Sequence, residues 1–345
     1  MATRRFRSPR ILIVAVALAV ILVAGVATLT LTGGESDARD QDFRIEDGRL
    51  VRLNGKRFVI RGVVLPYGTF AGGPGAGQAA LNYARIDQDV KRVRAEGANL
   101  VRVFVTPDTL EPRRFTQLER VVRAARAQRL VVQISASFRS FEATRPLVRR
   151  LAQRWAGNPR VWIQPMNEPQ CTNPVDNAAG RCEAWGLWRR QHTAYLRTIR
   201  AAGVTSPVVV NAPAFSTDMR PLARYRLKDR QVLYGAHRYG NTNASFDGRE
   251  RARVEEVVGA PSRRLPIFID EIGNFNGPQF PNAVAWSAGM AGWAAEWTRR
   301  GDGNGATGFN WRWSDANTMI GPDGRLTAWG QAFVRAILNG LRPAR

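Results

Sequence analysis

The chain has 345 residues and a formal net charge of +23, with 51 Lys plus Arg against 28 Asp plus Glu. This length accommodates one large domain with a full core. The positive charge predicts a solvated basic surface, with weak contact to anionic lipid or envelope polymers as the alternative; the absence of a recognition-module signature argues against a nucleic-acid partner.

The N-terminal region predicts a membrane anchor. Residues 11–31 carry no charge and are long enough to cross a bilayer as a helix. The basic segment 1–10 precedes them and is expected in the cytoplasm. A cleaved signal peptide is the alternative. Either way, the remainder of the chain is exported, held at the cell membrane or secreted.

A polar linker, residues 32–42, leads to the main body, residues 43–345. Asp47-Gly48 and Asn54-Gly55 separate short alternating segments and predict a small N-terminal β-hairpin.

Apolar runs then alternate with helical segments along the body. Strands are predicted at 58–65, 99–105, 130–137, 161–169, 207–211, 231–240, 265–273 and 306–315. Helices are predicted at 86–96, 114–128, 145–156, 183–202, shortly after 211, and at 250–259, 283–300 and 327–341. Eight such units favour a (β/α)₈ TIM barrel, with a doubly wound sheet as the alternative.

Two of these strands are expected to deliver a carboxylate to the cleft. Glu168 precedes Pro169, which is expected to end the fourth strand, and Glu271 lies near the end of the seventh. Two such carboxylates suit hydrolysis of a glycosidic bond, which needs a general acid and a nucleophile or base. By alternation along the strand, Asp270 is expected to point away from Glu271 and to be structural.

Other polar and aromatic side chains fall at predicted strand ends, where barrel enzymes keep their active sites. These candidates are Arg102, Asn167, His237, Tyr239, Trp311 and Trp313.

The two cysteines, Cys171 and Cys182, lie in one loop and predict a disulfide in an exported protein. No metal site or cofactor is expected, because the chain has only two cysteines and two histidines without ligand spacing.

Several segments together resemble the family 5 glycoside hydrolases, a cellulase-like group of barrels. They are 60–65 (IRGVVL), 99–103 (NLVRV), 158–169 (NPRVWIQPMNEP), 237–239 (HRY), 271–273 (EIG) and 311–315 (WRWSD). The resemblance extends over roughly residues 43–340.

The resemblance implies a role for each candidate residue. Glu168 is the expected acid/base and Glu271 the nucleophile, with Arg102 and Tyr239 bonded to Glu271. His237 is expected beside Glu168, Asn167 at the sugar 2-hydroxyl, and Trp311 stacked on the sugar ring, with Trp313 as a further candidate. One departure is the third strand, where Ser135 or Ser137 takes the place of the His common in the family.

These observations predict a membrane-anchored, extracytoplasmic, retaining β-glycosidase acting on β-1,4-glucan, mannan or a related polysaccharide. The alternatives are a transglycosylase on the same substrates, a carbohydrate-binding barrel without catalysis, and an envelope scaffold for anionic polymers.

Overall fold

The computed structural model describes residues 43–46, 49–52, 56–68, 83–136, 140–169, 185–240, 245–274, 282–312 and 318–343. The chain divides into two units, Met1–Asp42 and Phe43–Arg345, and every described residue belongs to the second.

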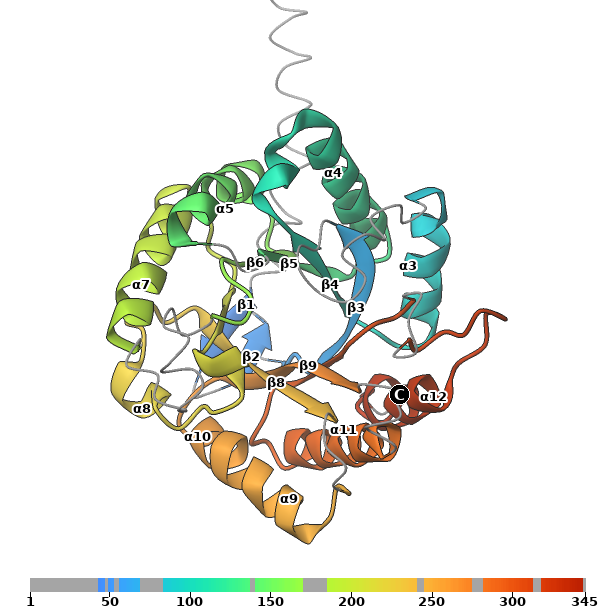
Figure 1. The fold of residues 1–345 in the computed structure, drawn as a ribbon. Helices are drawn as coiled ribbons and strands as arrows, with labels where there is room; N and C mark the ends of the chain where they lie inside the picture. The colour runs from blue at the N-terminus through green and yellow to red at the C-terminus, as the bar shows by residue number, and fades with distance from the viewer. Residues whose placement is uncertain are drawn as a thin grey trace, which may run out of the picture. The chain divides into compact units, whose positions relative to one another are not determined.

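Within the described residues, eight parallel strands close into a barrel in the order β10-β3-β4-β5-β6-β7-β8-β9 (Figure 1). They are β3 (Ile60–Gly68), β4 (Leu100–Val105), β5 (Val131–Ala136), β6 (Val161–Gln164), β7 (Val208–Asn211), β8 (Val232–Gly240), β9 (Ile267–Asn274) and β10 (Gly305–Gly308). The closed barrel confirms the predicted fold and excludes an open doubly wound sheet.

Helices surround the barrel (Figure 1). The main ones are α3 (Ile86–Ala95), α4 (Pro112–Ala127), α5 (Phe141–Trp155), α7 (Trp185–Ala201), α8 (Leu222–Tyr225), α9 (Gly248–Val254), α10 (Ala260–Ser262), α11 (Ala283–Arg299) and α12 (Ala328–Phe333). In α5, the Ser140 side chain caps the first turn by accepting from the Ala143 amide. Leu147, Leu151 and Trp155 then recur every four residues and are buried.

An apolar layer fills the interior of the barrel at the N-terminal ends of its strands. It contains one inward residue from most strands: Ile60, Leu100, Val131, Trp162, Val209, Leu233 and Phe268. The predicted N-terminal hairpin is present as β1 (Phe43–Glu46) paired antiparallel with β2 (Arg49–Arg52). Phe43 packs edge-on against Phe58 and Trp162, so the hairpin joins this layer.

A polar layer lies at the next inward positions of five strands. Its members are Arg102, Gln133, Gln164, Asn211 and Asp270, and all are fully buried. Buried polar groups are stable only when they are hydrogen-bonded, and these side chains bond mainly to one another.

Three predicted strand ends are wrong. β3 continues through Pro66, where its pairing with β4 shifts register and no regular ladder bond is required. β6 ends at Gln164, four residues before Glu168, and β10 ends at Gly308, before Trp311.

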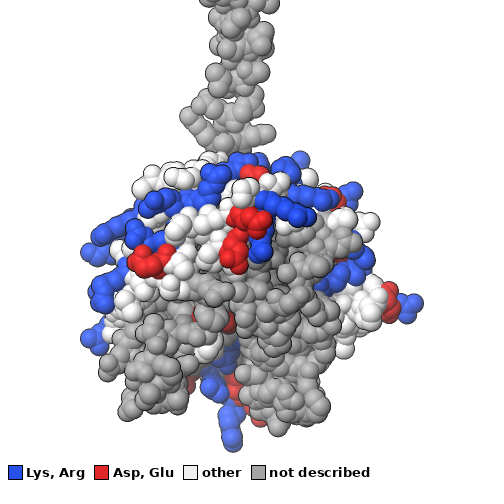
Figure 2. All heavy atoms as spheres, turned by 45° about the horizontal axis from the view of Figure 1, so that its top comes forward, with Lys and Arg blue, Asp and Glu red and all other residues white. Residues whose placement is uncertain are grey.

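Lys and Arg side chains are spread over the visible described surface, with Asp and Glu among them (Figure 2). Several arginines form surface ion pairs, including Arg154 with Glu119. This distribution agrees with the predicted solvated basic surface.

None of the helices in the described part of the chain is long and apolar enough to cross a bilayer. The predicted span at residues 11–31 lies outside that part.

Candidate active site

A bulge in β9 brings two consecutive carboxylates to the site. Ala236 of β8 pairs with Ile269, but the next residue, His237, pairs with Glu271, so Asp270 is an extra residue. A β-bulge interrupts the two-residue alternation of side chains. Both Asp270 and Glu271 are consequently buried among the site residues, and the expectation that Asp270 points away is wrong.

Glu271 is a buried carboxylate held by two donors. The guanidinium of Arg102 donates to Oε1, and the hydroxyl of Tyr239 donates to Oε2. Burial raises the pKa of Glu271, as does the nearby Glu168 carboxylate, while His237, Arg102 and the Tyr239 hydrogen bond oppose the rise. Tyr239 remains a donor, because burial and the charges of Glu271 and Glu168 raise its pKa well above its usual value.

Glu168 lies in the turn that follows β6, with a left-handed backbone at φ 44°. Non-glycine residues adopt this conformation rarely and at a cost, unless the surroundings hold them there. Its amide donates to Oδ1 of Asn211 at 3.2 Å. Its side chain is 22% exposed, whereas that of Glu271 is 3% exposed, so Glu168 is the more accessible carboxylate.

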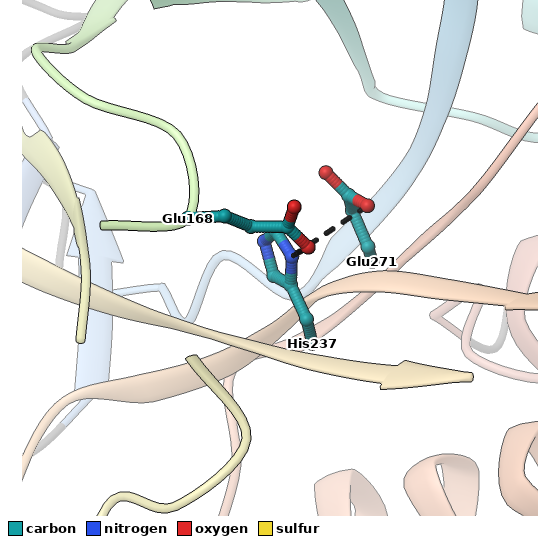
Figure 3. A group of neighbouring side chains, drawn as sticks. All are labelled: Glu168, His237 and Glu271. Carbon is teal, nitrogen blue, oxygen red and sulfur yellow. Dashed lines mark hydrogen bonds and ion pairs between the residues drawn. The ribbon is translucent and has the colours of Figure 1, made fainter. Parts of the chain in front are cut away.

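His237 lies between the carboxylates (Figure 3). Its Nδ1 is 2.7 Å from Oε1 of Glu168 and 3.6 Å from Oε2 of Glu271, and its Nε2 is 3.4 Å from Oδ2 of Asp270. Burial alone would lower the pKa of His237, but the charge of Glu271 and the hydrogen bonds to Asp270 and Glu168 raise it to about 10. A pKa of this size favours the protonated ring at neutral pH, in which both nitrogens are donors.

One oxygen of Glu168, one of Glu271 and a ring nitrogen of His237 lie within 4.8 Å of one another. This spacing could in principle suit a metal ion, but the donor set does not fit one. The histidine nitrogen is hydrogen-bonded to Glu168, and both Glu271 oxygens accept from other side chains. A metal ion would also lie close to the positive charge of Arg102.

Of the remaining predicted residues, some contact Arg102, one is buried in packing, and others lie outside the described part of the chain. Asn167 is buried and accepts from Arg102 through Oδ1 at 2.6 Å, and Ser135 accepts from Arg102 at 3.1 Å. Trp311 is fully buried, with the Arg92 guanidinium 5.9 Å from its ring, so it packs rather than offering an open stacking face. Three further predictions, Trp313, Ser137 and the Cys171–Cys182 disulfide, lie outside the described residues.

Sequence reasoning missed the polar layer beneath the carboxylates. Gln164 accepts from Arg102 and Gln133, and Asn211 and Gln133 both donate to Asp270. The available signal was a single polar residue within an otherwise apolar run, as in 131–134 (VVQI) and 267–270 (IFID). A lone polar residue in a buried strand requires partners, and the other such residues of a barrel supply them.

The arrangement combines an accessible carboxylate that contacts a protonated histidine with a buried carboxylate fixed by two donors. The first can exchange a proton with a bound molecule. The second is oriented and weakly solvated, which suits it to attack or stabilise a cationic centre.

The comparisons with known proteins agree with this chemistry. Residues 53–317 match the model of the cellulase family, glycosyl hydrolase family 5. A mannan endo-1,4-β-mannosidase of Cellvibrio japonicus is 23% identical over 339 residues, which cover 93% of this chain and 72% of that protein.

Solved structures share the fold. A β-glucanase of Saccharophagus degradans, in complex with cellotetraose, superposes with a TM-score of 0.70 at 17% identity, covering 88% of this chain and 94% of that one. A β-mannanase of Thermomonospora fusca, in complex with mannotriose, gives 0.64 at 19% identity, covering 88% and 98%. With its family match over most of its length, the chain belongs to glycosyl hydrolase family 5 and is a glycoside hydrolase.

Proposed function

We propose that the chain is a retaining β-glycosidase that cleaves β-linked glucan or mannan by double displacement. The observation that carries this proposal is the proximity of the two carboxylates, whose nearest oxygens lie within 4.8 Å of each other. Retaining enzymes hold the two carboxyl groups about 5–5.5 Å apart, whereas inverting enzymes leave about 6.5–9.5 Å for a water molecule.

In the first step, Glu271 attacks the anomeric carbon and the bond from this carbon to the leaving oxygen breaks. Glu168 gives its proton to that oxygen, so the leaving sugar departs as a neutral alcohol. A glycosyl ester on Glu271 remains. The donors on Glu271, Arg102 and Tyr239, favour its ionised form and fix the direction of attack.

In the second step, Glu168 acts as a base. It takes a proton from water, whose oxygen bonds to the anomeric carbon while the ester bond to Glu271 breaks. The sugar leaves with its original configuration, and both carboxyl groups return to their starting protonation states. The 22% exposure of the Glu168 side chain supports this role, because the proton exchanger must reach both the leaving group and water.

Asn167 is the proposed contact for the sugar 2-hydroxyl. Arg102 donates to its Oδ1 at 2.6 Å, which leaves the amide nitrogen to donate to a sugar oxygen. Hydrogen bonds to the 2-hydroxyl strengthen in the transition state and accelerate cleavage.

The substrate class rests on the relatives. The matched proteins are a mannan endo-1,4-β-mannosidase, a β-glucanase with bound cellotetraose and a β-mannanase with bound mannotriose. Residues 11–31 are proposed to hold this activity on the outer side of the cell membrane. Recovery of the intact chain, with its original N-terminus, from salt-washed membranes would support the anchor, and a shortened chain in the medium would favour cleavage.

The test of the function is reducing-end release by the full-length chain on a panel of β-glucans, mannans and xylans, with E271A as the control. Release that E271A abolishes supports hydrolysis and names the polymer class. Binding without release on every polymer contradicts the proposal and favours a carbohydrate-binding barrel. Longer products at high acceptor concentration favour a transglycosylase.

A further inference from the structure

We propose that Asp270 is a third functional carboxylate, a positioning residue that holds the two cationic side chains contacting Glu271 and Glu168. This inference rests on the proposed function, in which those two glutamates react with the substrate.

The geometry places Asp270 between Arg102 and His237. Its Oδ2 is 3.4 Å from Nη2 of Arg102 and 3.4 Å from Nε2 of His237. Each cation contacts a different glutamate on its other side: Arg102 donates to Glu271, and His237 donates to Glu168. A displacement of Asp270 would therefore reach both reacting carboxylates, although Asp270 itself is fully buried and is not one of the reacting groups.

The side chains around Asp270 stabilise an ionised carboxylate. It is fully buried, and it accepts from Gln133 at 2.8 Å, from Gln164 at 3.1 Å and from Asn211 at 3.2 Å. Burial raises the pKa of Asp270, but Arg102, His237 and the Gln133 donor outweigh it and lower the pKa to about 2. Replacing a buried ion pair by well-packed apolar residues often leaves the free energy of unfolding unchanged or higher, so stability alone does not require such a pair. Five polar partners around one carboxylate point instead to a role in orientation.

The position of Asp270 also determines where the proton of Glu168 lies. A neutral His237 that donated Nε2–H to Asp270 would present a lone pair at Nδ1, which would accept the acid proton of Glu168. The negative charge of Asp270 favours the doubly protonated ring, whose Nδ1–H donates to Oε1 of Glu168. The acid proton of Glu168 then occupies the other oxygen, Oε2, where it is available to a leaving group.

Charged groups from several elements determine the protonation of this ring. Glu168 follows β6, and Asp270 and Glu271 belong to β9. Arg102 of β4 and Tyr239 of β8 contact these carboxylates in turn. Glu168 and Glu271 change their charge during the reaction, so Asp270 is the carboxylate that keeps a constant negative charge beside His237.

The test uses the two histidines of the chain as separate probes in the full-length protein labelled at histidine with ¹³C and ¹⁵N. In the wild type, NMR should find His237 protonated at pH 7. His192 should be neutral, because burial lowers its pKa to about 4. In D270N, the titration midpoint of His237 should fall by more than about one pH unit, while that of His192 stays in place. The matched control D89N replaces another buried aspartate, one that contacts Tyr67 and Arg312 instead, and should leave both midpoints unchanged.

Kinetics give the second readout. D270N should lower kcat roughly 10²-fold, within the range of general acid–base effects, with KM changed by less than about threefold. An aryl glycoside whose leaving group needs no proton should lose less activity than a natural polymer.

A neutral His237 in the wild type at pH 7 would overturn the proposal, even if D270N failed to fold. So would a folded D270N with an unchanged His237 midpoint and unchanged kcat. Absence of turnover by the wild type on every polymer would contradict the proposed function, but the NMR result would still decide whether Asp270 controls His237.

Discussion

The backbone amide of Glu168 donates a hydrogen bond to the side-chain oxygen of Asn211, 3.2 Å away. This contact joins the turn after β6 to the end of β7, and it falls where the backbone of Glu168 is left-handed. The amide side chain of Asn211 donates in turn to the Gly235 carbonyl and to Asp270. The position of the proposed acid/base therefore depends on a strand that carries no catalytic group of its own.

Replacing Asn211 should misplace Glu168. N211A removes the acceptor of the Glu168 amide and should lower kcat at least about 10-fold, because small displacements of a reacting group can cost about 10²-fold. It should also destabilise the fold by about 1–3 kcal/mol through unpaired buried polar groups. Initial rates and urea unfolding measure the two effects.

N99A is the matched control, because Asn99 is a buried asparagine that pairs with the backbone of Arg61 and Val59. It should lose stability and keep its kcat. Equal losses of kcat in N99A and N211A would show that the effect on activity is general rather than local.

The two glutamates should differ in their dependence on the leaving group. E168Q keeps the nucleophile, so it should retain most activity on aryl glycosides with acidic leaving groups and lose about 10²- to 10⁴-fold on natural polymers. E271Q lacks the nucleophile and should fail on both. Parallel assays with a dinitrophenyl glycoside and a polymer distinguish the variants, and identical losses in both would contradict the assigned roles.

The two histidines predict a stability maximum near pH 6.5, the usual pKa of the side chain. The folded-state pKa of His192 is lowered to about 4, so the unfolded chain binds more protons between pH 4 and 6.5, and stability falls as the pH falls through that range. The folded-state pKa of His237 is raised to about 10, so its contribution is complete below pH 6.5 and is lost as the pH rises to 10.

Urea unfolding from pH 5 to 10 measures this dependence. The loss between pH 6.5 and 10 should be at least about 1.4 kcal/mol, the equivalent of one pKa unit. H237N should flatten the alkaline side of the curve and leave the acidic side in place. A curve still rising at pH 9 in the wild type would contradict the assignment.

Trp311 should act in packing and not in substrate binding. W311F leaves a cavity in the core and should destabilise the fold by less than the roughly 3–5 kcal/mol of a Trp-to-Ala change, and it should leave KM within about twofold. W311F and the wild type are compared by thermal unfolding and by polymer kinetics. A large rise in KM without loss of stability would restore the expected stacking role.

The barrel was predictable because each of its strands is a short apolar run between helical segments, a pattern that depends on local chemistry alone. The positions of Glu168 and Glu271 followed from the same runs. The end of β6 was predicted too late. Pro169 indicates only the last position that a strand could reach, whereas the observed strand ends earlier because its pairing with β7 is limited to Ile163 and Val208.

The role of Asp270 could not be predicted from side-chain alternation, because the alternation is broken in β9. A bulge is a property of two paired strands and not of one sequence segment. The polar layer around Gln133 and Gln164 was missed for a related reason, because both side chains donate to Asp270, which lies 137 and 106 residues further along the chain.

The extra residue in β9 also constrains how this sequence can change. Deleting one residue between Ile269 and Ile272 would put β9 back in step with β8 and β10, and the sheet would become more regular. The residues in that interval are Asp270 and Glu271, so the deletion would leave one acid, and the gain in regularity would remove either the nucleophile or the anion beneath it. Single substitutions cannot recover the lost position, because they change a side chain without changing the register. The proposed chemistry therefore depends on the number of residues in β9 as much as on which residues they are.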